Sequence, residues 1–232
     1  MSLGRSVALA YHGVDTVSPD ADPERLITSP GHLRAHIRLL RRFGYRFVTT
    51  REIGAASRPR GRVALLTFDD GFADWVTEAL PILEQERAVA SFYVCPGWWE
   101  DQHPLVRGAA GRLLAARDVR RLVDAGMAVG SHGWDHTDLR THDDETLARQ
   151  LTDSRAAVAE VTGEPCGAVA YPYGLSDARV QRAAEAAGYE LAWGWQPGQW
   201  RPYDAPRLPA PPRHGALRLG LKLLGVRRFW SR

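Results

Sequence analysis

The feature that most constrains the fold is a regular alternation between short apolar runs and longer stretches with helical spacing. Short apolar runs predict buried strands, and apolar positions repeating every three to four residues predict helices. From residue 60 onward, strands are predicted at 63–68, 88–94, 127–131, 168–171 and 189–195. Helices are predicted at 74–87, with a kink or late start at Pro81, and at 119–125, 143–161 and 177–187. Asp118 is the predicted N-cap of the second helix.

The first sixty residues add two further strand and helix pairs. The strands are expected at 7–11 and 47–49, and the helices at 31–43 and 51–56. Consecutive strand–helix units build a parallel sheet covered by helices. We therefore predict an α/β fold, a single-domain (β/α) barrel that is distorted and has about seven strands. A doubly wound open sheet is the alternative.

Composition supports one globular domain followed by a basic tail. The chain has 232 residues, 44% of them apolar and 25% charged, which is enough for one full core. Residues 205–232 carry seven Arg/Lys and no acid, so the remainder holds 23 basic and 27 acidic residues. The predicted division is a barrel at 1–204 and a basic C-terminal tail or docking helix at 205–232. Because the positive charge belongs to the tail, we expect no nucleic-acid partner.

The tail and the N-terminus bear on location. A solvated tail or one that docks on the barrel is favoured, and contact with a membrane surface through Leu217, Leu221 and Leu224 is the minority alternative. No signal-like or membrane-spanning stretch is evident, so a cytoplasmic location is the default expectation, with a membrane-peripheral one left open. Cys95 and Cys166 are expected in the core. Nothing in the sequence indicates an oligomeric state.

Polar residues follow several of the predicted strands. Asp69 and Asp70 come directly after the strand at 63–68, and His132 and His136 follow the strand at 127–131. His12 and residues 171–174 occupy equivalent positions after two other strands. Because the C-terminal ends of parallel strands gather on one face, these residues are expected to form one site.

The residue types at this site are typical of hydrolytic metal centres. Asp70, His132 and His136 provide one carboxylate and two imidazoles, and histidines four apart on a helical turn share a face. Adjacent side chains at a strand end point to opposite sides, so Asp69 is free to take a proton from the metal-bound water. One divalent ion is expected, preferably zinc, with cobalt, nickel, manganese and iron left open. Asp135 is expected to orient a neighbour or point away.

Each motif alone has a simpler interpretation. Asp69-Asp70-Gly71 could be an ordinary turn in which the acids bond the backbone, and the two histidines could be incidental surface imidazoles. Their combination, with an apolar run before each, favours the metal site.

These motifs resemble those of the polysaccharide deacetylase family, the NodB-homology domain of carbohydrate esterase family four. Thr67-Phe68-Asp69-Asp70-Gly71 matches the first family motif, and Gly130–His136 matches the second. The resemblance covers residues 6–195 and implies Asp69 as the base and Asp70, His132 and His136 as the metal ligands. It also implies removal of an N-acetyl group from an amino sugar in a glycoconjugate, oligosaccharide or biosynthetic intermediate.

The remaining family motifs match in part. Residues 169–174, Val-Ala-Tyr-Pro-Tyr-Gly, carry the tyrosine whose backbone N–H is implied in the oxyanion hole, Tyr173. This variant is familiar in one branch of the family, but Ala170 replaces the arginine that normally steadies the base, so the partner of Asp69 is unidentified. The usual histidine acid has no clean match. His12 is the preferred substitute and His214 the other, with a structural histidine as the alternative reading of His12.

Aromatic residues near the expected site suggest carbohydrate binding. The resemblance implies a tryptophan near the acyl methyl group, either Trp193 or Trp195, and Tyr171 and Trp134 are further candidates. Ordinary packing of these large side chains is the alternative. An N-acetylated carbohydrate is the expected partner. The competing functions are hydrolysis of a non-sugar amide or cyclic imide on the same fold, and a non-catalytic carbohydrate-binding relic.

Overall fold

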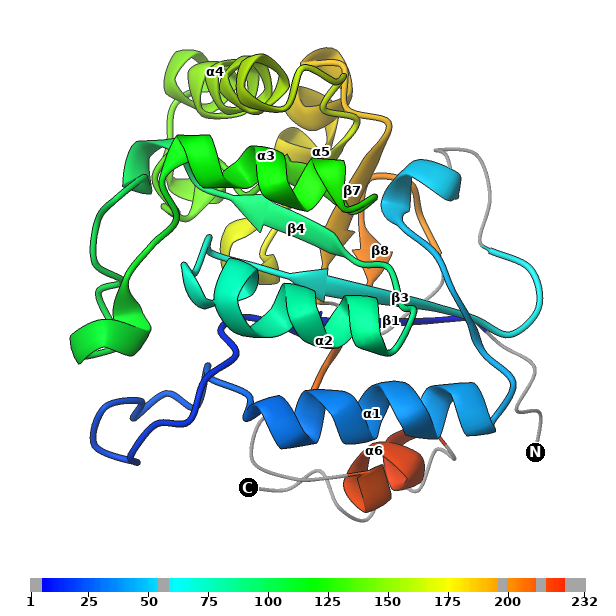
Figure 1. Cartoon of the computed structure of the whole chain (residues 1–232). Coiled ribbons are helices and arrows are strands. Elements are labelled where there is room, and N and C mark those ends of the chain that lie inside the picture. Colours follow the sequence, from blue (N-terminus) through cyan, green and yellow to red (C-terminus); the bar gives the residue numbers. More distant parts are fainter. Residues whose placement is uncertain (1–5, 54–58, 196–199, 212–215, 224–232) are drawn as a thin grey trace.

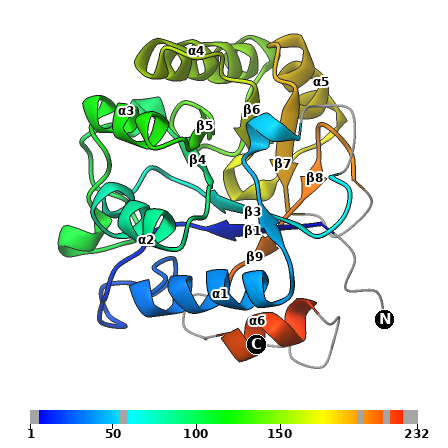
Figure 2. The ribbon, with the colours of Figure 1, turned by 45° about the vertical axis from the view of Figure 1, so that its right-hand side comes forward.

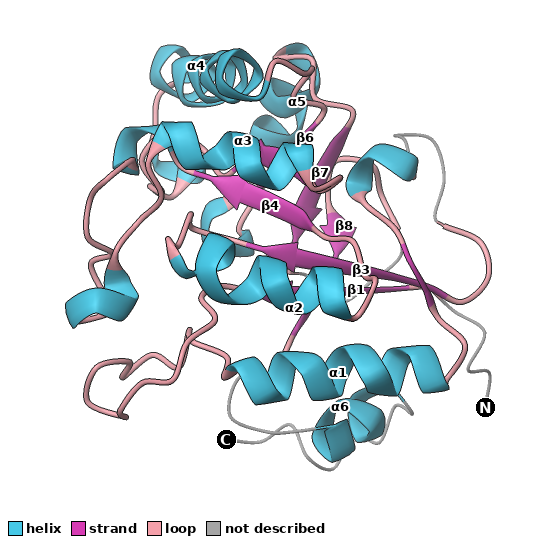
Figure 3. Ribbon diagram, in the orientation of Figure 1, coloured by secondary structure: helices cyan, strands magenta, loops and turns pink. Residues whose placement is uncertain are grey.

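A sheet of parallel strands at the centre of the molecule curls into a nearly closed barrel, and helices cover its outside (Figures 1 and 3). The computed structural model describes residues 6–53, 59–195, 200–211 and 216–223. The strands are β1 Val7–Tyr11, β2 Arg46–Phe47, β3 Val63–Phe68, β4 Ser91–Val94, β5 Ala128–Ser131, β6 Ala168–Ala170, β7 Leu191–Gly194, β8 Ala205–Pro206 and β9 Leu208–Pro209. The α-helices are α1 Pro30–Arg42, α2 Leu80–Gln85, α3 Ala116–Asp124, α4 Asp144–Thr162, α5 Ala178–Ala186 and α6 Ala216–Leu223.

The two ends of the sheet come together at a single residue. The strands follow the order β8-β7-β6-β5-β4-β3-β1-β9, with β2 paired to β3 outside this path. The strands at the two ends, β8 and β9, are separated in sequence by Arg207 alone. The chain therefore passes from pairing with β7 to pairing with β1 within a few residues. This arrangement confirms the predicted (β/α) barrel and excludes the doubly wound open sheet.

Side chains alternate between the inside and the outside of the barrel, as strand geometry requires. Leu65 of β3 belongs to an inner cluster with residues of the other strands, including Tyr93 and Trp193. Its neighbour Leu66 packs outward in the larger cluster, which contains Leu33 and other apolar residues of the helices. Every residue of β3 is buried, which is why its sequence is a nearly continuous apolar run, interrupted only by Thr67, rather than an alternating one.

The observed helix boundaries agree with some of the predicted helix ends and N-caps and differ from others. Asp143 caps α4, because its side chain accepts a hydrogen bond from the Thr146 amide. Asp118 does not cap α3: that helix begins at Ala116 after Ala115, so this prediction was wrong. The predicted helix at 74–87 is divided into a π-helical segment, Trp75–Ala79, and α2, with Pro81 in the first turn of α2. The predicted helix at 51–56 is a single 3₁₀ turn, Thr50–Glu52, and residues 54–58 lie outside the described residues.

The barrel continues past the predicted boundary at residue 204. Both β8 and β9 belong to the sheet, and α6 lies against α1 on the outside (Figure 2). Leu219 of α6 is fully buried, and Gly220 lies next to Leu39 of α1. The described part of the basic segment is therefore docked, while residues 224–232, including Leu224, lie outside the described residues. None of the described helices combines the length and apolarity needed to cross a bilayer.

Candidate active site

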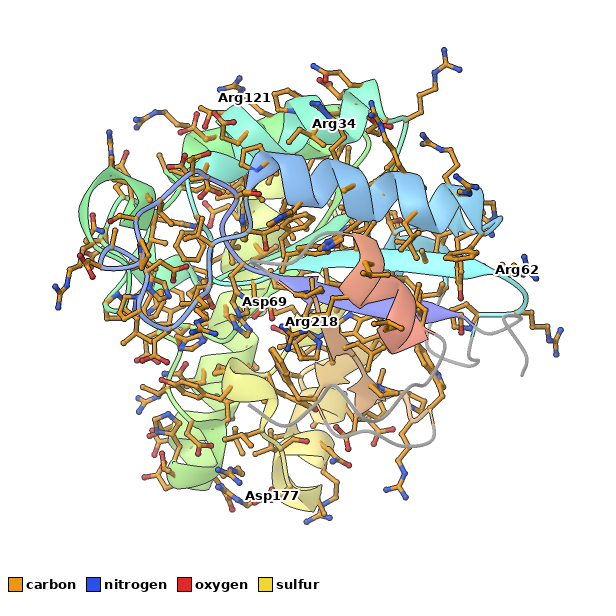
Figure 4. All side chains as sticks on the ribbon, turned by 90° about the horizontal axis from the view of Figure 1, so that it is seen from below. Arg34, Arg62, Asp69, Arg121, Asp177 and Arg218 are labelled. Carbon is orange, nitrogen blue, oxygen red and sulfur yellow. The ribbon has the colours of Figure 1, made fainter. Side chains whose placement is uncertain are left out.

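The site begins where β3 ends. The Asp69 amide donates to the Tyr11 carbonyl at 3.0 Å, which extends the ladder between β1 and β3 by one residue. Asp70 then adopts φ 83° and Gly71 φ 96°, both in the left-handed region. The two carboxyl groups therefore diverge because the backbone turns at Asp70, and not through the strand alternation that the sequence suggested. Both are almost completely buried, and Asp69 lies deep among the side chains in Figure 4.

Two histidines face one oxygen of Asp70. Nε2 of His132 and Nε2 of His136 each lie 3.3 Å from Asp70 Oδ1. These histidines do not share a helical turn, as the i, i+4 spacing suggested. They lie on a loop after β5 in which Gly133 and His136 both have positive φ, 75° and 59°. The loop turns back on itself, and this turn brings the second imidazole to the first.

The hydrogen bonds around these groups fit a divalent cation. His132 Nδ1 lies 2.6 Å from the Ala170 carbonyl, and a carbonyl only accepts, so Nδ1 carries the hydrogen and Nε2 keeps its lone pair. Asp70 Oδ1 has no hydrogen-bond partner among the described residues, although it is buried. One ligand atom from each of Asp70, His132 and His136 lies within 4.8 Å of the others. Two imidazole nitrogens and a carboxylate are a ligand set that zinc prefers.

Asp69 has a different partner, Arg207. The guanidinium Nη1 of Arg207 donates to Asp69 Oδ1 at 2.7 Å and to Thr67 Oγ1 at 3.1 Å. Thr67 in turn donates to the Leu9 carbonyl at 3.0 Å, so its hydroxyl is oriented to accept from Arg207. Burial would raise the pKa of Asp69, but the charge and hydrogen bond of Arg207 hold it below its usual value. Position 170 is an alanine and offers Asp69 no cation, so Arg207 is the arginine that steadies this carboxylate.

Sequence reasoning missed Arg207 because this residue stands 138 positions from Asp69. It was counted among the basic residues of the tail. The only local signal is that Arg207 is a single charge within the otherwise uncharged run 205–212. From the sequence alone, a buried arginine in such a run cannot be distinguished from one on the surface. Its exposed fraction is 1%.

A third histidine, His103, was also missed. Its Nε2 lies 3.3 Å from the other oxygen of Asp70, Oδ2, and its exposed fraction is 3%. Burial alone would raise the pKa of Asp70, but the neighbouring imidazoles of His12, His103, His132 and His136 hold it well below its usual range. Asp70 therefore remains an anion.

His12 follows β1 and Tyr173 follows β6, at the same end of the sheet as Asp69 and Asp70. His12 interacts electrostatically with both Asp70 and Asp69, and burial lowers its pKa despite these two carboxylates. The ring of Tyr173 is 4.6 Å from that of His136, and its backbone has φ 57°. Asp70, His136 and Tyr173 are three of the six non-glycine residues with positive φ in the described chain. Such backbone strain gathers at functional sites.

The structure separates the four aromatic candidates into two pairs. Trp134 is 38% exposed, and Trp195 is partly buried, with its ring centroid 6.3 Å from that of His12. Trp193 is completely buried inside the barrel and donates from Nε1 to the Tyr93 hydroxyl at 2.5 Å. Tyr171 is also completely buried, and its hydroxyl donates to the Tyr203 carbonyl. The structure therefore does not bring Trp193 and Tyr171 to the surface of the site.

Two other sequence candidates have simple placements. Asp135 accepts hydrogen bonds from Thr137 and from the side-chain amide of Gln150, so it holds the histidine loop rather than joining the ligand cluster. His214 lies outside the described residues.

Comparison with known proteins identifies the family. The sequence model of polysaccharide deacetylases matches residues 56–192. A chitooligosaccharide deacetylase of Rhizobium leguminosarum bv. trifolii is 28% identical over 58% of this chain and 58% of its own length. The peptidoglycan-N-acetylmuramic acid deacetylase PdaA of Bacillus subtilis is 25% identical over 55% of this chain and 44% of its own length. The chain spans about half the length of the curated relatives that it matches.

A solved structure shares the whole fold. The Streptococcus pyogenes deacetylase PplD, in complex with acetate, aligns with a TM-score of 0.81 at 23% sequence identity. The alignment covers 94% of this chain and 98% of that one. At this identity the similarity concerns the fold, and it extends over more of the chain than the family match does.

Proposed function

Because the chain belongs to the polysaccharide deacetylase family, we propose that it is a metal-dependent hydrolase that removes the N-acetyl group from an amino sugar. The observation that carries this proposal is the pairing of two buried carboxylates with separate partners. Asp70 faces two imidazole nitrogens, and Asp69 is bonded to Arg207. A ligand set beside an ionised base is what hydrolysis of an unactivated amide requires.

Asp70 Oδ1, His132 Nε2 and His136 Nε2 would hold one divalent ion, preferably zinc. When bound, such an ion supplies a Lewis acid that lowers the pKa of water and stabilises negative charge on a carbonyl oxygen. The Ala170 carbonyl fixes the ring of His132 in the tautomer that this role needs.

Asp69 is assigned the role of general base. Arg207 contacts Oδ1, so Oδ2 is the oxygen that takes the proton from the attacking water. The lowered pKa keeps the carboxylate ionised at neutral pH, and the ion pair fixes its orientation. The Tyr173 backbone N–H is assigned to the oxyanion of the tetrahedral intermediate.

His12 is assigned the delivery of a proton to the leaving amine. Its interaction with Asp69 and Asp70 places it beside the reacting groups, and its lowered pKa makes it a stronger acid once it is protonated. Trp195, next to His12, is assigned to the acyl methyl group, and Trp134, with its exposed face, to the sugar ring.

The substrate class follows from the relatives. The names of the curated relatives specify chitin, chitooligosaccharide and peptidoglycan amino sugars as substrates. We therefore propose an N-acetylated carbohydrate as the substrate of this chain.

The test measures acetate release from N-acetylglucosamine oligomers by the purified chain. We expect activity that chelation abolishes, that zinc or cobalt restores, and that Asp69→Asn lowers by about 10²–10⁴-fold. Activity that survives both complete metal removal and Asp69→Asn would contradict the proposal.

The same assay run with cyclic imides and simple amides distinguishes the alternative hydrolase. The replacement of the family arginine by Ala170 is compatible with that alternative, whereas the contact of Arg207 with Asp69 supports the sugar N-deacetylase. We expect turnover of sugar acetamides and none of the imides. Turnover of imides alone would replace the proposed substrate class while keeping the metal site.

A further inference from the structure

His103 contacts the metal-facing aspartate from the side opposite the ligand cluster. It lies on the long connection between β4 and α3, outside the sequence motifs of the site. Its Nε2 is 3.3 Å from Asp70 Oδ2, whereas His132 and His136 face Oδ1. Both members of the pair are buried, with side-chain exposed fractions of 2% and 3%. Polar atoms buried this completely are as a rule hydrogen-bonded, and each is the other's neighbour here.

The backbone determines which nitrogen of His103 carries the hydrogen. The Leu105 amide donates to Nδ1 at 3.1 Å, and a backbone N–H only donates. Nδ1 therefore keeps its lone pair, and Nε2 carries the hydrogen that Asp70 Oδ2 accepts. His132 has the opposite tautomer, because its Nδ1 donates to the Ala170 carbonyl. The two imidazoles on Asp70 thus differ in kind: His132 presents a lone pair, and His103 presents an N–H.

The ring of His103 is held rigidly against the turn that carries Asp70. It stacks on Phe72, with ring centroids 4.8 Å apart, and meets Trp98 edge-on at 5.6 Å. The His103 amide donates to the Gly111 carbonyl at 2.7 Å, which closes the connection on itself.

The connection is also tied to the Asp-Asp-Gly turn. The Leu114 amide donates to the Gly71 carbonyl at 2.8 Å, and the Ala73 amide donates to the Arg112 carbonyl at 2.9 Å. These two bonds flank Phe72, on which the imidazole stacks. The position of His103 relative to Asp70 is therefore set by backbone bonds on both sides of the turn.

We propose that His103 is a positioning residue for the metal centre: its Nε2–H holds Asp70 Oδ2 so that Oδ1 faces His132 and His136. The inference rests on the proposed metal-dependent function. Asp70 has left-handed backbone geometry and a short side chain, and rotation of its carboxylate would turn Oδ1 away from the two imidazoles. A hydrogen bond to the non-ligating oxygen prevents that rotation and keeps the site formed before the ion arrives.

The experiment measures the zinc dissociation constant of the full chain, stripped of metal, by competition with a chromophoric chelator. His103→Phe keeps a flat ring between Phe72 and Trp98 but removes the donor, and we expect zinc affinity to fall by about 10–100-fold. His103→Gln places an amide N–H near the position of Nε2 and should restore affinity to within a few-fold. His103→Asn reaches only as far as Nδ1 and should not restore it.

A matched control is His32→Asn on α1, because the His32 ring stacks on His36 and belongs to a helix outside the site. Its zinc affinity should equal that of the unsubstituted chain. Cobalt(II) absorption of each variant at saturating metal supplies the second measurement. The band positions should be unchanged in His103→Phe, because His103 is not a ligand.

Several outcomes would overturn the inference. Equal zinc affinity in His103→Phe and the unsubstituted chain would show that the hydrogen bond has no effect on the site. A changed cobalt spectrum at saturation would make His103 a ligand. Equal losses of zinc affinity in His103→Gln and His103→Asn, with the melting temperatures of the metal-free proteins unchanged, would contradict the donor role. If His103→Phe does not fold, the comparison of these two variants tests the inference. Failure of the unsubstituted chain to bind zinc or cobalt would instead overturn the proposed function.

Discussion

Asp69 and Asp70 are adjacent, equally buried residues of the same type, yet their environments are opposite. Asp69 is bonded to the guanidinium of Arg207, a permanent cation, whereas Asp70 is surrounded by the imidazoles of His103, His132 and His136. An arginine cannot give up its proton to make room for a metal, but a neutral imidazole offers a lone pair. The difference teaches that two identical carboxylates are distinguished by their partners, which is the basis for proposing Asp69 as the base and Asp70 as the ligand.

The largest expected effect separates the two carboxylates directly. Asp69→Asn should lower the rate of acetate release by about 10²–10⁴-fold and leave zinc affinity within a few-fold, because it removes the base and no ligand. Asp70→Asn should lose both, because the site loses its only anionic ligand. Isothermal titration with zinc beside the acetate assay checks both variants. If both substitutions gave the same loss of zinc binding, the division of roles would be wrong.

The next effect concerns the ion pair. Arg207→Met leaves Asp69 buried beside no cation, and we expect a loss of about 3–5 kcal/mol in the free energy of unfolding at pH 7. Urea denaturation measures it. Asp69→Asn in the same chain removes the unpaired charge, so the double variant should recover part of the loss. Additive losses in the double variant would mean that the pair is not coupled.

The ion pair also has a pH dependence with a definite sign. Because the pKa of Asp69 is lowered in the folded chain, the stabilisation is present above the unfolded-state pKa of about 3.9 and disappears as the pH falls through the lower folded value. The difference in stability between the unsubstituted chain and Arg207→Met should therefore shrink below about pH 4. Urea midpoints at pH 3 and pH 7 check this. A constant difference across that range would place the effect of Arg207 in packing rather than in charge.

A third carboxylate, Asp74, extends the comparison to a buried acid with no cation. Burial raises its pKa to about 8, reinforced by Asp15 and Glu78 and opposed by the Val14 amide. A raised pKa means that stability is fully present below about pH 4 and is lost as the pH rises through about 8. Asp74→Asn should thus be more stable than the unsubstituted chain by a few kcal/mol at pH 9, at about 1.4 kcal/mol per pKa unit, and equal to it near pH 4.

Thermal melts across this pH range measure the effect of Asp74→Asn, with the exposed Asp20→Asn as the control. A pH-independent difference for Asp74→Asn would contradict the raised pKa.

The smallest effects compare an outer and an inner tryptophan. Trp134→Ala should raise KM for a chito-oligosaccharide by about tenfold, the equivalent of one lost contact of about 1.4 kcal/mol, with little change in stability. Trp193→Phe should lower stability by about 1–2 kcal/mol, because it removes a buried hydrogen bond to Tyr93, and leave KM unchanged. A raised KM in Trp193→Phe would return this residue to the substrate site.

Much of the fold could be predicted from local patterns. The strand at 63–68 was located to the residue, and the helices at 31–43 and 143–161 to within one residue, because apolar spacing and a cap such as Asp143 are written in adjacent positions. Asp118 failed as a cap because an acid in the first turn of a helix and an acid before it look the same in sequence.

The residues of the candidate site also fall into two groups, those that local patterns predicted and those that they did not. Asp69, Asp70, His132 and His136 are brought together as expected, because strand ends in a parallel barrel converge whatever the details of the loops. Arg207 and His103 had no such signal. Arg207 lies between two two-residue strands, β8 and β9, and His103 lies in a connection without regular repeats. Arg207 contacts Asp69 and His103 contacts Asp70, which are 138 and 33 residues away in sequence, so no local pattern marks either contact.

The sequence by itself determined that this chain is built of repeated strand–helix units with an acid pair and a histidine pair just after strands, since periodicity and residue type are local properties. Only the tertiary structure decided that the sheet curls into a barrel and which partner each acid has. Arg207 reaches Asp69 because the barrel closes at that residue, and His103 reaches Asp70 because a long connection folds back on the turn. Buried charges take their character from neighbours in space, and those neighbours are not adjacent in the chain.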